Sequence, residues 1–437
     1  MRMVVENFLT TSKIRRVKME TKKLFISFCV ILLMVTIPFI GMGANPNPPL
    51  KTGVLKIGSS MPLSGPGSPW GIPEAEVTSI YADLINKDGG VTIGGTTYKI
   101  NFIVSDDKLT PDGIKASADR LVHTEKVNAV IGGWVPPIAA IFGRECATAN
   151  IPMLHMVRET LGVEVVSPKF PTMFDIGWPQ IQGIKVYIPK LKSAALPNIK
   201  TYALICKDDT LGRTMLELIK GLKQEWESKY GLALIYDDMF PLTAQDMTPW
   251  LSKIAALPKK VDLIFAASAT VPNLAMIAKQ SYELGIKCPV VTVPNLTDVA
   301  EFIKITGYEA SQFVYTSGCA PWDFPKTSAK YKEMANRIRK VWKDKHGTDL
   351  TFGDSFAWCA NHLAAYLSAA KIAHSIKTED IVRALETKPI EHFYGTSTAS
   401  GEKTYGIKRM LTFEATISKI VGNVQKPVVT LGGDPIP

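Results

Sequence analysis

Two strand–helix cycles follow one another between residues 55 and 133, and they constrain the fold more than any other feature of the sequence. Leu55 to Ser59 is an apolar strand, which must end at the proline- and glycine-containing segment 62–66. A helix should follow, because the apolar residues from Val77 to Ile85 share one helical face and glycines come after them. Strands alternating with helices are typical of a parallel sheet covered on both faces.

The same alternation continues along the chain. Residues 166–183 contain three prolines and two glycines, so we expect a connection between two lobes there. The segment 390–437 is predicted to form mainly short strands. The other predicted strands are 100–104, 129–133, 152–157, 201–206, 232–239, 261–267, 290–293 and 313–316, and the other predicted helices are 114–125, 138–149, 214–226, 248–256, 274–284, 328–346 and 356–374.

The length of 437 residues favours two domains, and 46 % hydrophobic with 21 % charged residues excludes extensive disorder. An uncharged run at 24–40 follows Lys22-Lys23 and ends in small residues, so we predict that residues 1–44 are a secretory signal peptide. A membrane anchor is the alternative, and Met19 is an alternative start to Met1. The mature protein is expected in the periplasm or another extracytoplasmic compartment.

Without residues 1–44 the chain has 43 basic and 38 acidic residues, a net charge of +5 instead of +10. It has no basic run with interleaved aromatic residues, so no nucleic-acid partner is expected. Five scattered cysteines remain, and we interpret them as buried thiols rather than a disulfide framework, although one chance pair stays open. They are Cys146, Cys206, Cys288, Cys319 and Cys359.

Signatures of catalysis are missing from the sequence. There is no GxGxxG, GxxxxGK[ST], GxSxG or HExxH motif and no clustered set of histidines and cysteines, so we predict no catalytic residue, no metal and no cofactor. The adjacent carboxylates Asp106-Asp107 and Asp208-Asp209 are interpreted as caps at strand ends rather than as acid/base pairs. A hydrolase with an unrecognised site is a weaker alternative.

Tryptophans occur in loops that are placed to bind a ligand. In an open parallel sheet, ligands lie beyond the carboxyl ends of the strands. Trp70, Trp134 and Trp178 fall in three of the four loops at such ends. An indole offers a large apolar face and one donor, which suits a ligand wall, whereas packing against a neighbouring loop is the alternative for each.

Short segments in both halves carry a family resemblance through their order. They are 55–58 with 62–65, 85–91, 106–107 with Pro111, 127–133, 208–212 and 282–285. The series resembles the type I periplasmic solute-binding proteins of the branched-chain amino acid (leucine/isoleucine/valine-binding) ABC transporter family. The resemblance implies two Rossmann-like α/β lobes with parallel central sheets joined by three hinge crossings, with 54–176 and 321–393 in lobe 1 and 177–320 and 394–437 in lobe 2.

The resemblance also implies a function. The two lobes would close over a small solute and deliver it to the permease and ATPase subunits of an ABC importer in the inner membrane. We expect a monomer that binds its solute without altering it. A ligand-sensing receptor domain that signals to a membrane partner is the alternative.

The family pattern differs here at the ligand contacts. Family members that bind amino acids use Ser/Thr groups where this chain has Val135-Pro136-Pro137 and Val157-Arg158-Glu159, and Val293-Pro294-Asn295 includes no acid for a ligand ammonium. Proline cannot donate an amide, whereas Arg158 can bind a carboxylate through two hydrogen bonds, so an amino-acid-like, amide or aromatic carboxylate solute is predicted in place of an ordinary α-amino acid. The alternative is that Arg158 and Glu159 pair internally. The predicted ligand-binding residues are Trp70, Trp134, Val135, Pro136, Val157, Arg158, Glu159, Trp178, Leu211, Thr270, Asn295 and Phe356.

Overall fold

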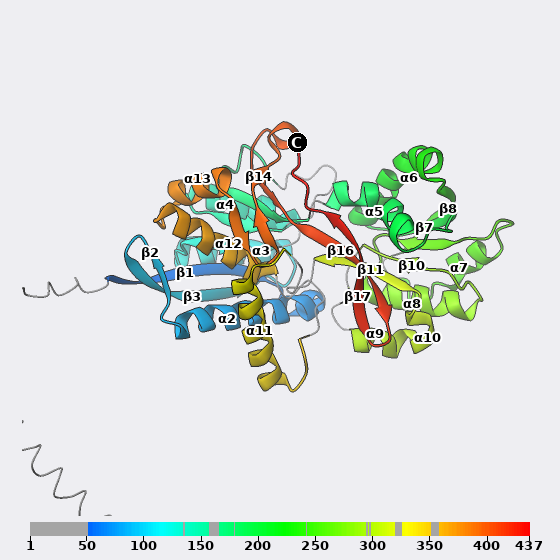
Figure 1. Ribbon diagram of the computed structural model, residues 1–437, viewed down its shortest axis with the longest axis horizontal. Coiled ribbons are helices and arrows are strands. Elements are labelled where there is room, and N and C mark those ends of the chain that lie inside the picture. Colours follow the sequence, from blue (N-terminus) through cyan, green and yellow to red (C-terminus); the bar gives the residue numbers. More distant parts are fainter. Residues whose placement is uncertain are drawn as a thin grey trace, which may run out of the picture. The chain divides into compact units, whose positions relative to one another are not determined.

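Two sheets dominated by parallel strands form the fold (Figure 1). The computed structural model describes residues 51–133, 136–156, 166–178, 180–241, 243–293, 296, 299–319, 326–350 and 358–437. The alternation of strands and helices in the sequence therefore produces the predicted fold class, with parallel central strands and helices between them. Antiparallel strands are confined to the edges of both sheets.

The first sheet has eight strands in the order β14-β15-β6-β5-β4-β1-β3-β2. β1 pairs in parallel with both β3 and β4, and the parallel run continues through β5, β6 and β15. The strands are β1 (Lys51–Met61), β2 (Val91–Ile93), β3 (Thr96–Asp106), β4 (Ala129–Ile131), β5 (Met153–His155), β6 (Met173–Gly177), β14 (Ala399–Ser400) and β15 (Met410–Thr412). All the parallel strands consequently end at one edge of this sheet.

The second sheet has seven strands in the order β17-β16-β11-β10-β9-β7-β8. β7 to β11 are parallel, while β16 and β17 form an antiparallel hairpin at one edge. The strands are β7 (Thr201–Lys207), β8 (Ala233–Phe240), β9 (Leu263–Ala266), β10 (Val290–Val291), β11 (Val314–Cys319), β16 (Glu414–Val421) and β17 (Val424–Gly432). A separate two-stranded ribbon joins β12 (Ile390–His392) to β13 (Gly395–Ser397).

Helices cover both faces of each sheet, because alternate strand residues point to opposite faces. In β4, Ala129 and Ile131 join the core under α2, α11, α12 and α13, whereas Val130 joins the core under α3 and α4. In the second sheet one core lies under α5 and α6 and the other under α7, α8 and α9. The helices are α2 (Ser68–Lys87), α3 (Pro111–Ala118) with the π-helical η2 (Asp119–Thr124), α4 (Pro136–Thr148), α5 (Gln180–Ala194), α6 (Thr210–Tyr230), α7 (Thr248–Ala255), α8 (Val271–Glu283), α9 (Val299–Thr306), α10 (Tyr308–Ser311), α11 (Ala329–His346), α12 (Trp358–Ala373), α13 (Thr378–Thr387) and α14 (Glu402–Tyr405), with a 3₁₀ turn, η1, at Gly65–Gly67.

Between β1 and β17 the chain crosses from one sheet to the other three times, as predicted. The first crossing leads from β6 to β7, the second leaves β11 and returns to the first sheet, and the third leads from β15 to β16. Only Phe413 separates β15 from β16, so the third crossing is short. An ion pair between Lys326 and Glu414 joins residues beside the second and third crossings.

A fourth connection is formed by the C-terminal tail, residues 433–437, which the sequence analysis did not anticipate. After β17 ends in the second sheet, the carbonyl of Ile436 accepts a hydrogen bond from the Gly401 amide at 2.8 Å, and the Ile436 amide donates to Ser400 Oγ at 3.1 Å. The Ile436 side chain is buried in the core under α3 and α4. The tail therefore returns from the second sheet to the first.

Several predicted boundaries differ from the structure. The segment 166–183, predicted as a connection, contains the buried strand β6, because its prolines and glycines flank the strand instead of interrupting it. Helices α5 and α13 are not among the predicted elements, and α5 includes Pro189. Strands β14 and β15 pair in the first sheet, although the sequence analysis assigns 394–437 to the second lobe. The division into two lobes at the predicted boundaries stays a prediction.

Two buried histidines are neutral in the folded protein. His362 Nδ1 accepts a hydrogen bond from the Gly132 amide at 3.2 Å, and His392 Nδ1 accepts one from the Tyr394 amide at 3.2 Å. Neither nitrogen has room for a proton. Burial lowers the pKa of His362 from 6.5 to about 4. Burial, together with repulsion from His362, lowers the pKa of His392 to about 3.

We expect acid to destabilise the fold through these rings. The unfolded chain takes up their protons near pH 6.5, whereas the folded chain does so only near pH 4 or below, so stability is full above pH 6.5 and is lost as pH falls toward 4. Urea unfolding at pH 7.5 and pH 5 should differ by on the order of 2 kcal/mol or more. The His362→Gln variant should show a shallower pH dependence, and the exposed control His374→Asn should not; equal pH dependence in all three proteins would contradict this assignment.

Removing the anchor of the C-terminal tail should also destabilise the protein. Ile436→Ala is expected to lower the free energy of unfolding by about 2–4 kcal/mol, because it leaves a cavity in the core of the first sheet. The neighbouring Pro435 is exposed, so Pro435→Ala is the matched control and should change stability by no more than about 0.5 kcal/mol. If the two variants unfold at the same urea concentration, the tail does not contribute to the core.

Candidate ligand-binding site

Asp106, at the carboxyl end of β3, positions the loop that follows β1. Its Oδ1 accepts hydrogen bonds from the backbone amides of Leu63 and Lys108, both at 2.9 Å, and its Oδ2 accepts one from Ser64 Oγ at 2.6 Å. Although partial burial alone raises the pKa of this carboxyl, the hydrogen bonds from Ser64 and from the backbone outweigh it and lower the pKa. A charged Asp106 therefore fixes the turn from β1 into α2.

Asp107 points the other way and has a separate structural task. Its Oδ2 accepts a hydrogen bond from Ser60 Oγ on β1 at 2.8 Å, and its Oδ1 accepts one from the Leu109 amide at 2.8 Å. Burial raises the pKa of this carboxyl. The two adjacent carboxylates thus act as caps in different directions, as the sequence analysis expects.

Trp70 lies in the first turn of α2, directly after this loop. The helix begins close to the loop backbone: a Cβ on Gly71 would lie 2.1 Å from the Pro62 carbonyl oxygen, so only glycine fits. Trp70 is partly buried, which leaves part of its indole accessible beyond the carboxyl end of β1. Its predicted contact with a ligand stays a prediction.

The loop after β4 depends on two glycines and on His362. Gly132 and Gly133 have φ of +85° and +92°, and residues with a side chain rarely adopt such backbone conformations. His362 of α12 links two strand ends, because it accepts from the Gly132 amide through Nδ1 and donates from Nε2 to the Ile176 carbonyl at 3.1 Å. The chain then begins α4 at Pro136.

The second sheet has a similar arrangement at its carboxyl ends. Asp209 caps α6 by accepting from the Gly212 amide at 2.7 Å and pairs with Lys207 at 2.8 Å, while Asp208 pairs with Arg213 at 2.7 Å. Ser268, beyond the end of β9, accepts from the Lys207 amide at 2.8 Å. These two carboxylates are also occupied by caps and ion pairs.

The two predicted ligand contacts described in the second sheet lie at helix starts. Thr270 caps α8, with its hydroxyl donating to Asn273 Oδ1 at 2.6 Å and accepting from the Asn273 amide at 3.4 Å. Leu211 lies in the first turn of α6, partly buried against the core under α5 and α6. Both residues follow strand ends that face the same edge of the second sheet.

The remaining predicted residues divide into two groups. Trp178 is 6 % exposed and packs in the core under α5 and α6, where a Cβ on Gly183 would lie 2.2 Å from its ring. Pro136 begins α4, and nothing is described of its side chain. The residues that lie outside the described part of the chain are Trp134, Val135, Val157, Arg158, Glu159, Asn295 and Phe356.

Glu74 is a structural residue that the sequence analysis did not identify. It is fully buried in α2, and its Oε1 accepts a hydrogen bond from the Cys359 amide in the first turn of α12 at 2.9 Å. A carboxylate at a helix N-terminus is stabilised by the free amides there. Glu74 thereby joins the helix that carries Trp70 to the helix that carries His362. No local sequence signal marks Glu74, since it lies 285 positions from its partner Cys359.

Two further observations limit the chemistry of the described residues. Within them, no cluster of three or more histidine, cysteine, aspartate or glutamate side chains is arranged to hold a metal ion. In the same residues, none of the helices has the length and apolar character needed to cross a membrane. Cys146, Cys206, Cys288 and Cys359 are buried and free, and Cys319 ends β11.

Comparison with known proteins agrees with this architecture. A family profile described as "Periplasmic binding protein" matches residues 54–418. The fold is similar to the branched-chain amino acid transporter substrate-binding protein LivJ from Streptococcus pneumoniae in complex with isoleucine, with a TM-score of 0.68 and 20 % identity over 86 % of this chain and 99 % of that one.

Two structures from Rhodopseudomonas palustris are also similar. One is an ABC transporter solute-binding protein in complex with 3,4-dihydroxybenzoic acid, with a TM-score of 0.67 and 21 % identity over 88 % of this chain and 99 % of that one. The other is a solute-binding protein in complex with 4-hydroxybenzoate, with a TM-score of 0.68 and 16 % identity over 88 % and 98 %. At these identities the likenesses show the fold.

The fold is that of a type I periplasmic binding protein, with two mixed sheets whose parallel strands end in short capped loops. The chain belongs to the periplasmic binding protein family. The resemblance to periplasmic solute-binding proteins, predicted from the sequence, is confirmed. The fold is similar to those of substrate-binding proteins of the branched-chain amino acid transporter group, as the sequence also indicated. Family membership implies an extracytoplasmic location, while the signal peptide lies outside the described residues and stays a prediction.

Asp106 offers a direct test of how the loop before Trp70 is positioned. Asp106→Ala should speed amide hydrogen exchange at Leu63 and Lys108, because both amides lose their acceptor, and should lower the free energy of unfolding by about 1–3 kcal/mol. Asp106→Asn retains one carbonyl oxygen and should keep most of the protection. Equal exchange rates in the wild type and Asp106→Ala would show that the loop is positioned by other contacts.

Proposed function

We propose that this protein is the extracytoplasmic solute-binding subunit of an ABC importer, which binds a small organic solute and delivers it to a membrane permease and its ATPase. The family membership carries this proposal. The fold supports it, because each sheet ends its parallel strands in loops and helix N-termini, where backbone amides can bind a ligand.

Three crossings between the sheets suit a ligand trap that opens and closes. If the lobes close over a solute, the closed form gains contacts from both, so the solute shifts the population toward it. A micromolar affinity requires only about 8 kcal/mol of net binding free energy. A few desolvated polar contacts and an aromatic wall such as Trp70 are sufficient for that.

We propose that the solute is an amide or a carboxylate, aromatic carboxylates and amino-acid-like compounds included. Arg158 would bind the carboxylate through two hydrogen bonds. Pro136 and Pro137 have no amide hydrogen, so the first two residues of α4 cannot donate backbone hydrogen bonds to an α-amino acid. The similar Rhodopseudomonas palustris proteins in complex with hydroxybenzoates are consistent with this solute class.

Binding without chemical change is consistent with the carboxylates of the described residues. Asp106, Asp107, Asp208 and Asp209 all accept hydrogen bonds or form ion pairs with nearby groups of the fold, and the two carboxylates of each adjacent pair have different partners. General acid/base catalysis would require at least one such group to face a substrate. Turnover of a bound compound by the purified protein would contradict this part of the proposal.

A receptor that reports ligand to a membrane partner is the second candidate, because the same fold can serve either purpose. Genes for two permeases and two ATPases beside the gene for this protein would favour import. Mass spectrometry of the solute released from the purified protein, with a thermal-shift screen of aromatic acids, amides and amino acids, would identify the ligand.

Replacing Arg158 tests the proposed solute class. Arg158→Ala should weaken binding of the identified acidic solute by more than about tenfold, because the paired hydrogen bonds to the carboxylate are lost. Stability should change by no more than about 0.5 kcal/mol. Isothermal titration calorimetry and urea unfolding measure the two quantities.

The matched control is Arg144→Ala, since Arg144 is an exposed arginine on α4. This variant should bind the solute as the wild type does. If Arg158→Ala also binds with unchanged affinity, Arg158 pairs elsewhere and the solute is bound by other groups.

A further inference from the structure

A cavity lies among the helices on one face of the first sheet. Its volume is about 470 Å³, and its walls come from α2, α11, α12 and the start of β12. Pockets of roughly 300–1,000 Å³ are typical of small-molecule sites. Tyr81 of α2 lines this cavity eleven positions after Trp70, about 16 Å along the helix. The cavity is therefore separate from the loops at the carboxyl ends of the strands.

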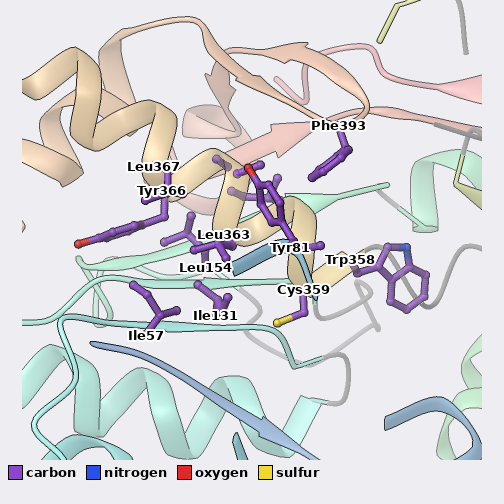
Figure 2. Close-up of a cluster of buried hydrophobic side chains, with 14 of the residues drawn as sticks. Ile57, Tyr81, Ile131, Leu154, Trp358, Cys359, Leu363, Tyr366, Leu367 and Phe393 are labelled. Carbon is purple, nitrogen blue, oxygen red and sulfur yellow. The ribbon is translucent and has the colours of Figure 1, made fainter. Parts of the chain in front are cut away.

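Much of the cavity wall is apolar and firmly packed. Tyr81 and Leu367 line it, and the Tyr81 ring packs edge-on against Phe393 with centroids 5.1 Å apart (Figure 2). Tyr331 of α11 adds a second aromatic ring, which packs against Phe393 from 4.8 Å. These rings offer a rigid surface to the apolar body of a ligand.

The charges around the cavity leave one ammonium group without a partner. Lys330 pairs with Glu391 at 2.6 Å, and Arg337 makes two hydrogen bonds to Asp88 at 2.6 and 2.7 Å. Lys371 lines the same cavity and makes no hydrogen bond or ion pair with any described residue. Lys371 is partly exposed; partial desolvation and repulsion from Lys330 lower its pKa, and these outweigh the attraction of Glu391, which raises it.

Ser368 adds a donor beside this ammonium. It precedes Lys371 by three positions on α12, so both side chains lie on the same helical face, and both line the cavity. Ser368 Oγ accepts a hydrogen bond from the Glu391 amide at 3.3 Å, which leaves its own hydroxyl hydrogen to donate. Asp88, Lys330 and Glu391 also line the cavity, but they are paired with one another or with Arg337. The remaining ammonium and hydroxyl, in a cavity with aromatic and aliphatic walls, match an anionic group attached to an apolar body.

We propose that this cavity binds a small organic monoanion with an apolar body, such as a medium-chain carboxylate, with Lys371 and Ser368 contacting the anionic group and Tyr81, Tyr331 and Leu367 contacting the rest. The site lies within one lobe and does not depend on the proposed function of the protein. It would accept its ligand whether or not a solute occupies the carboxyl-end loops.

The test uses the fluorescent anion 8-anilinonaphthalene-1-sulfonate as the probe, decanoate as a competitor and decan-1-ol as its uncharged control, all with the full chain at pH 7.5. The wild type should bind the probe, and decanoate should displace it more effectively than decan-1-ol. Lys371→Met should lower the affinity for the probe by about tenfold, whereas the affinity of Lys371→Arg should stay within about threefold of that of the wild type. The matched control Lys115→Met, at an exposed lysine on α3, should leave the affinity unchanged.

Ser368→Trp, which fills the cavity, should abolish probe binding, and near-ultraviolet circular dichroism checks that each variant is folded. If Ser368→Trp does not fold, the comparison of Lys371→Met with Lys371→Arg still tests whether the cavity binds the anion. Equal affinities of Lys371→Met and the wild type, or equal displacement by decanoate and decan-1-ol, would overturn the proposal. Displacement of the probe by the solute that purifies with the protein would also overturn it, because the probe would then occupy the proposed solute site.

Discussion

The structure depends on side chains that satisfy the backbone where parallel strands end. A strand that ends inside a protein leaves amide and carbonyl groups that must find partners. Asp106 accepts from two amides of neighbouring loops, His362 bridges the ends of β4 and β6, and Ser268 accepts from the end of β7. The positions of the loops, and with them of any ligand bound there, follow from these few contacts.

The two inferred sites rest on different physical arguments. The proposed solute site uses loops beyond the strand ends and needs both lobes, so its occupancy would be coupled to the opening and closing of the protein. The cavity beneath α2, α11 and α12 lies within one lobe, where packed rings already fix its walls. Binding there would add to the stability of that lobe by mass action without requiring closure.

Most of the fold could be predicted from regular periodicity in the sequence. Contacts between residues far apart in the sequence could not be predicted. The central strands and the helices between them follow from apolar alternation and from capping residues such as Asp209, which is adjacent in sequence to the helix it caps. Helix α5 was missed because Pro189 and the proline-rich segment before it favour a loop. The Gly132–His362 contact spans 230 positions and carries no local signal. Trp178 has a place in the sequence that suits a ligand wall, and it is 6 % exposed and packed in the core; its contact with a ligand stays a prediction.

The return of the C-terminal tail to the first sheet has a mechanical consequence. Both β1 and the tail are bound to elements of the first lobe. The segments that form the seven strands of the second sheet therefore begin and end in the first lobe. A force applied between residues 51 and 437 would be carried first by the eleven paired residues of β1 and β3, in shear, and by the tail contacts. The second sheet would bear no load until those gave way, so single-molecule extension would rupture the two halves in a fixed sequence.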